Sequence, residues 1–163
     1  IMYKYFNSMS IISDGLLKLS FGFIFFNYGY VKLNNLILGN GEGLIKMIAT
    51  MPIFNIFPVL FSWTLALAEI SIFIGLLYGV LSFFPFSNLI TKLSGILSLF
   101  ITIVIIYQHI FVWGDNIFTY GPIRFLNIAD GGKAIFGQVL FIPISLYIIF
   151  SNSQNSNYIS DTK

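Results

Sequence analysis

Cysteine is absent from this sequence and charge is scarce. The missing cysteines exclude disulfides, thiolate metal sites and redox-active dithiols. A single histidine excludes bis-histidine haem ligation within this chain alone. No nucleotide-binding loop, catalytic triad or metal-ligand cluster is recognisable, so the sequence offers no self-contained catalytic constellation. We expect no metal site and no covalently bound cofactor.

The few charges are scattered singly along the chain. Eight Lys and Arg stand against six Asp and Glu, for a net charge of +2, and no basic tract occurs. Nucleic-acid binding needs a basic surface that neutralises several phosphates. We therefore expect no nucleic-acid partner.

Hydrophobic residues are abundant instead. They make up 57% of the 163 residues, whereas charged residues at 9% are too few to cover a soluble globule of this size. The apolar residues gather in four segments of about the length that crosses a bilayer, at about 14–33, 55–80, 89–113 and 134–150. The first segment lacks the small-residue cleavage site of a signal peptide, so we expect it to stay as an anchor.

These segments predict an all-α integral membrane protein. Its fold class is a four-transmembrane-helix bundle that forms a single domain over residues 1–150, followed by a disordered polar tail over 151–163. Between the first and second spans, glycines at 39, 41 and 43 interrupt the helix, and Glu42 then stands in the first turn of a short new one. Leu44, Ile45 and Ile48 line one side of it, which predicts an interfacial helix.

Glu69 is the one ionisable residue of the second span and lies near its middle. A carboxylate at that depth costs about 2–3 kcal/mol or more on insertion, so protonation, a partner or a protein interior must offset it. Such a group suits proton exchange or a hydrogen bond to a quinone carbonyl. The alternative is a protonated or lysine-paired glutamate that only fixes helix packing. We predict Lys18 as its partner within the chain, although Asp14 competes for Lys18 at a spacing of four.

The first span concentrates its polar and small residues on one face. Within an arc of about 80° lie Asp14, Lys18, Gly22, Phe25, Gly29 and Lys32. We expect this arc to face the bundle, because glycines allow close helix approach and charges avoid acyl chains. The alternative is that Lys18 and Lys32 extend to opposite interfaces.

Two further stripes of small or polar residues predict helix contacts. In the second span the stripe is Thr64, Ala68, Ser71, Gly75 and Gly79, with Ser62, Ala66 and Glu69 on a neighbouring face. In the third span it is Gly95, Ser98, Thr102 and His109, which we expect to point inward. His109, with Gln108 and Trp113 nearby, suits donation to a quinone head group or uptake of its proton, but a histidine at a helix end is more often a satisfied polar group.

The last connection and the last span carry the remaining polar residues. Asp115, Arg124 and Asp130 lie in the connection over 114–133, where they either bind an oxyanion or form solvated ion pairs. In the fourth span Pro143 predicts a kink. The same span contains one side-chain amide, that of Gln138.

The order of these features resembles the DoxX family of small four-span membrane proteins. The residues that carry the likeness are Lys18, Gly29 and Lys32 in the first span, the segment GEGLIKMIATMP ending near Pro52, and Ala68, Glu69, Gly75 and Leu76 in the second span. Together they cover about residues 14–80. The Ala-Glu pair within a span is the most specific of them.

The resemblance implies a membrane protein that works with redox enzymes, some members being the small membrane subunit of thiosulfate:quinone oxidoreductases. We therefore expect at most a membrane subunit of a quinone-linked oxidoreductase, with quinone as the possible ligand and a redox protein or a second copy of this chain as partner. The alternatives are a non-catalytic structural or assembly subunit and, less favoured, a small-molecule transporter. The expected location is the cytoplasmic membrane of a prokaryote, with both termini in the cytoplasm.

Overall fold

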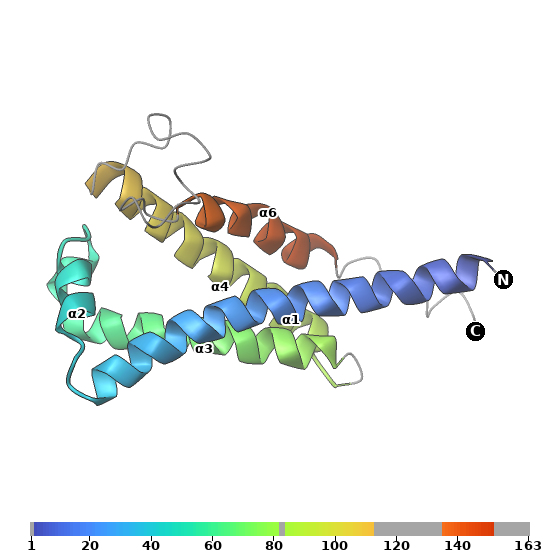
Figure 1. Ribbon diagram of the computed structural model, residues 1–163, viewed down its shortest axis with the longest axis horizontal. Coiled ribbons are helices and arrows are strands. Elements are labelled where there is room, and N and C mark those ends of the chain that lie inside the picture. The colour runs from blue at the N-terminus through green and yellow to red at the C-terminus, as the bar shows by residue number, and fades with distance from the viewer. Residues whose placement is uncertain (1, 82–83, 113–134, 152–163) are drawn as a thin grey trace, which may run out of the picture.

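A computed structural model describes residues 2–81, 84–112 and 135–151, and in these ranges the chain is helical (Figure 1). The elements in order are α1 (Met2–Ile37), α2 (Glu42–Ala49), a 3-10 turn (Phe54–Ile56), α3 (Pro58–Val80), α4 (Ser87–Tyr107), a π-helical turn that continues α4 (Gln108–Val112), and α6 (Ile135–Ser151).

The all-α prediction is confirmed, as is the short helix between the first two long ones. Three segments of the described chain are long and apolar enough to cross a membrane, namely Met9–Ile37, Pro58–Val80 and Ser87–Val112. The apolar helix α6 is shorter, at 17 residues. Helix α1 begins at Met2, well before the predicted span, because neither glycine nor proline interrupts the preceding residues.

The outward faces of the long helices are apolar. Phe23 on α1 is 57% exposed, Leu67 on α3 is 53% exposed and Phe100 on α4 is 56% exposed. Soluble monomers rarely expose apolar surface on this scale. Together with the length of the three spans, these faces identify the chain as a helical integral membrane protein whose surface contacts lipid.

The helices pack in a sequential order (Figure 1). Helix α3 contacts α1 on one side and α4 on the other, and α4 in turn contacts α6. Helix α2 packs against α3 at one end of the bundle, and the N-terminal part of α1 extends past the other helices at the opposite end. The buried apolar core draws on all four long helices: Phe21, Phe25, Ile72, Leu76, Ile101 and Ile148.

Glycines of α1 form the contact with α3. A Cβ added at Gly22 would lie 3.1 Å from the Phe73 ring, and one added at Gly29 would lie 2.8 Å from the Ala66 carbonyl oxygen. Gly22 and Gly29 are seven residues apart, so they occupy the same face two turns from each other. The predicted inward arc of α1 is thus confirmed at both glycines, and Phe25 between them is buried.

The small-residue stripe of α3 is only partly a helix contact. Gly75 and Gly79 do face α4, against Ser94 and Thr91. Thr64 and Ser71 are exposed, which corrects the prediction for that half of the stripe. Each of these two hydroxyls donates to a carbonyl of its own helix, at 2.9 and 2.8 Å, and so tolerates an outward position. The buried residues of α3 follow the neighbouring face instead: Ser62, Ala66, Glu69, Ile72, Gly75 and Leu76.

The inward stripe of α4 is confirmed. Ser98 and Thr102 are buried, as is His109 in the π-helical turn. The Ser98 hydroxyl lies 2.8 Å from the Ser145 hydroxyl of α6, and a Cβ at Gly95 would lie 2.9 Å from Ile149. Helix α6 therefore packs along this stripe.

The contact at Gly29 predicts a selective loss of stability. Gly29→Ala should destabilise the bundle by about 1–3 kcal/mol, because the new methyl group would overlap the α3 backbone. The measurement is the thermal unfolding midpoint of the purified protein in detergent. Gly15→Ala is the matched control, since its Cβ would meet only Val80 at 3.7 Å. Equal midpoints for the two variants would contradict the close α1–α3 approach.

Candidate functional site

A buried ion pair joins α1 to the middle of α3. The Lys32 ammonium donates to Glu69 Oε1. Glu69 stands eleven residues from either end of α3, and its side chain is 1% exposed, against 22% for Lys32. The lysine therefore reaches from near the end of α1 to a carboxylate at mid-helix depth.

The prediction that Lys18 is the partner of Glu69 is wrong. Gly29 packs against Ala66, Glu69 and Ile70, so this residue of α1 lies level with Glu69 in the antiparallel pair. Lys32 is three residues past that contact. Lys18 is eleven residues before it, about 16 Å along the helix axis. The lysine side chain is too short to cover that distance.

Lys18 pairs within its own helix instead. Its ammonium donates to Asp14 Oδ2 at 2.5 Å, the competing i,i+4 contact considered from the sequence. Lys18 is buried, with 3% of its side chain exposed. The arc on α1 thus holds two ion pairs, one near each end of its inward face, and only Lys32 reaches Glu69.

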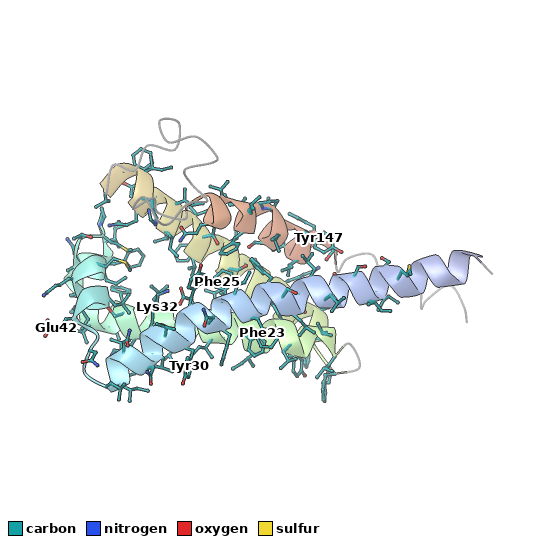
Figure 2. The ribbon with its side chains drawn as sticks, viewed as in Figure 1. Phe23, Phe25, Tyr30, Lys32, Glu42 and Tyr147 are labelled. Atoms are coloured by element: carbon teal, nitrogen blue, oxygen red, sulfur yellow. The ribbon has the colours of Figure 1, made fainter. Side chains whose placement is uncertain are left out.

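A cavity opens beside the Lys32–Glu69 pair. Side chains from all four long helices line it: Phe25, Tyr28, Lys32, Glu69, Thr102, Ile105, Gln138 and Phe141. The centres of water-sized molecules can occupy about 60 Å³ of this cavity. Figure 2 shows Phe25 and Lys32 on the side of α1 that faces α4 and α6, while Tyr30 points away.

The walls of this cavity are largely aromatic. The Phe25 and Phe141 rings lie 5.6 Å apart between centroids, and the Lys32 ammonium lies 5.6 Å from the centre of the Tyr28 ring. A lysine at that distance from a ring gains cation–π attraction. An apolar wall with a few convergent polar groups is the usual composition of a small-molecule site.

Three oxygen atoms of residues that line the cavity have no hydrogen-bond partner among the described residues. They are Glu69 Oε2, Thr102 Oγ1 and Gln138 Oε1, which come from α3, α4 and α6. A buried polar atom without a partner costs about 1–3 kcal/mol. Buried oxygens that lack a protein partner are commonly hydrogen-bonded to ordered water or to a ligand.

The candidate residues at the end of α4, Gln108 and His109, lie beyond this cavity. The α4 part of the lining stops at Ile105, one helical turn before His109. Gln108 donates from Nε2 to Thr50 Oγ1 at 3.0 Å and so ties the end of α4 to the end of α2. His109 is buried beside it. The π-helical turn brings these consecutive residues inward together.

The predicted surface candidates Asp115, Arg124 and Asp130 lie outside the described residues, as do Trp113 and the tail over 152–163. Within residues 2–81, 84–112 and 135–151, no group of three His, Cys, Asp or Glu side chains stands close enough to hold a metal ion. The cavity beside Glu69 is therefore the site that the described residues offer.

Gln138 is the member of the site that sequence reasoning missed. From the sequence, Gln138 is only a polar residue of the last apolar segment, and Thr102 is only part of the inward stripe of the third span. The signal for both was present, because a polar side chain inside an apolar span faces the bundle interior by default. The aromatic wall had no signal, since phenylalanine occurs throughout the chain.

Comparisons with protein-family models, curated proteins and solved structures find no match to this chain. The resemblance to the DoxX family therefore rests on the residues that carry it.

The ion pair predicts a large penalty for removing one partner. Lys32→Met should lower stability by about 3 kcal/mol, the low end for a broken buried pair because Lys32 keeps some exposure. The pair Lys46–Glu42 is the matched control: it is 3.5 Å long and about 80% exposed, so Lys46→Met should cost below about 1 kcal/mol. The measurement is again the thermal midpoint in detergent.

The double variant Lys32→Met with Glu69→Leu should recover most of that loss, because it removes both charges and keeps side-chain volume. A double variant less stable than Lys32→Met alone would show that the carboxylate is not compensated by this lysine.

Proposed function

We propose that this protein is a small membrane subunit of a quinone-linked redox complex, whose cavity beside Glu69 receives the quinone head group. In this proposal α6 is the fourth membrane crossing and α2 lies at the interface. The protein resides in the cytoplasmic membrane of a prokaryote with its termini in the cytoplasm. It works with a redox protein rather than as an enzyme by itself.

The observation that carries the proposal is the cavity itself. An ionisable pair, three unpartnered oxygens and an aromatic wall meet between four apolar helices. A lipid-soluble ring with oxygen substituents matches that combination, since the ring suits the wall and the oxygens suit the polar groups. The pair is also poised for proton exchange, because a ligand that competes for Lys32 changes the charge balance at Glu69.

The second candidate is a structural or assembly subunit in which the pair serves helix packing alone. The close approach of α1 and α3 beside the pair favours it, since Gly29 and Glu69 belong to one contact. The two functions differ in whether an ionisable group is needed once the bundle is folded.

Variants at the pair test the difference. Glu69→Gln and the double variant Lys32→Gln with Glu69→Gln keep hydrogen-bonding groups but remove the carboxylate. In the native host, we expect both to lower quinone-linked electron transfer of isolated membranes at least about 10-fold, the usual contribution of a positioned acid or base being about 100-fold or more. Thiosulfate is one electron donor to use, and immunoblotting measures the amount of protein.

Glu42→Gln is the matched control, because that carboxylate is 81% exposed on α2. Normal electron transfer in the double variant at normal abundance would favour the structural role. If the Gln variants do not accumulate in the membrane, their activity cannot be compared. Electron transfer is then measured in the Lys32→Met, Glu69→Leu double variant, which removes both charges and is expected to fold.

A further inference from the structure

We propose that the cavity binds its ligand through the ligand's own O–H groups, so that it selects a neutral hydroxyaromatic molecule, a quinol, over the oxidised quinone. The inference rests on the proposed function in one respect: the natural ligand is taken from the quinone–quinol pair. The chemistry behind it comes from the four side chains Lys32, Glu69, Thr102 and Gln138.

Charge decides that the ligand is neutral. Lys32 and Glu69 already compensate each other at the cavity wall, and the described lining residues include no further Asp, Glu, His, Lys or Arg. A charged ligand would leave a net charge in a low-dielectric interior, which is strongly unfavourable. A cation bound by the three oxygens would in addition lie next to the Lys32 ammonium. Metal ions and charged substrates are thus poor occupants of this site.

Hydrogen bonding decides that the ligand is a donor. Glu69 Oε2 and Gln138 Oε1 are acceptors as placed, and the Thr102 hydroxyl can accept or donate. Lys32 and the Gln138 amide also carry N–H donors that could bind a quinone carbonyl. A quinone, however, offers no hydrogen to the unpartnered Glu69 Oε2, which can only accept as a carboxylate oxygen. A quinol offers two O–H donors and can give one to the carboxylate, which forms the stronger charge-assisted bond.

The walls and the size of the cavity indicate that the O–H groups of the ligand are attached to a ring. Phe25 and Phe141 present aromatic surface, and Ile105 adds an apolar one. The centres of water-sized molecules can occupy about 60 Å³ of this cavity, which is room for several waters or one small ring. The mostly apolar lining favours one substituted ring over a few water molecules, which would satisfy the oxygens but would hydrate apolar surface.

Three probes that share one carbon skeleton test the inference. Tetramethylhydroquinone carries two O–H donors, tetramethylquinone carries only acceptors, and the dimethyl ether of the hydroquinone has neither donor. Binding is measured by equilibrium dialysis on the whole chain in lipid nanodiscs under anaerobic conditions. We expect the hydroquinone to bind at least about 10-fold more tightly than the other two, a factor that one charge-assisted hydrogen bond supplies.

Two variants locate the binding. Thr102→Val and Gln138→Leu each remove one unpartnered oxygen and keep side-chain volume, so each should weaken hydroquinone binding several-fold. Thr64→Val is the matched control, because Thr64 is exposed and bonded to its own helix. Thermal midpoints report whether the variants fold, and the probe series on the unaltered protein tests the inference even if they do not.

The outcomes separate this inference from the proposed function. Equal or tighter binding of the oxidised quinone overturns the donor argument and leaves a quinone-linked role in place. Binding of none of the three probes overturns it as well and points to water as the occupant. Tight hydroquinone binding together with normal electron transfer in the Lys32, Glu69 double Gln variant would keep the ligand class and remove the redox role.

Discussion

A carboxylate and an ammonium held together between apolar helices set the main constraint on this fold. Neither charge is tolerable at that depth alone, because the surrounding medium cannot solvate it. Lys32 must therefore stay within side-chain reach of Glu69, and α1 must stay close to α3. Glycine at position 29 makes this approach possible, since any side chain there would meet the α3 backbone.

The same constraint explains where the cavity lies. Lys32 satisfies one oxygen of Glu69 and leaves the other without a partner, and Thr102 and Gln138, which line the same cavity, add two more unpartnered oxygens. Aromatic and apolar residues close the space without filling it. A better packed interior would cover these oxygens with apolar atoms at a cost in free energy. The polar cavity is thus tied to the ion pair, and the two features are best interpreted together.

Much of the fold was predictable, whereas the pairing was not. Hydrophobic length located the helices, and periodicity located the inward faces of α1 and α4, because both signals come from local spacing. Choosing Lys32 over Lys18 required the register between α1 and α3, which depends on contacts such as Gly29 with Ala66 and has no local signature. The outward position of Thr64 and Ser71 was hidden for another reason: a hydroxyl bonded within its own helix does not reveal which way it faces.

The seven-residue interval between Gly22 and Gly29 has a consequence for how this chain can change over time. Exchanging one apolar residue for another along the outer faces alters little, since lipid accepts either. Inserting or deleting one residue after Gly22 would turn everything beyond it by about 100°, carrying Lys32 away from its counter-ion without altering the hydropathy of α1. Length between these two positions is consequently harder to vary than composition.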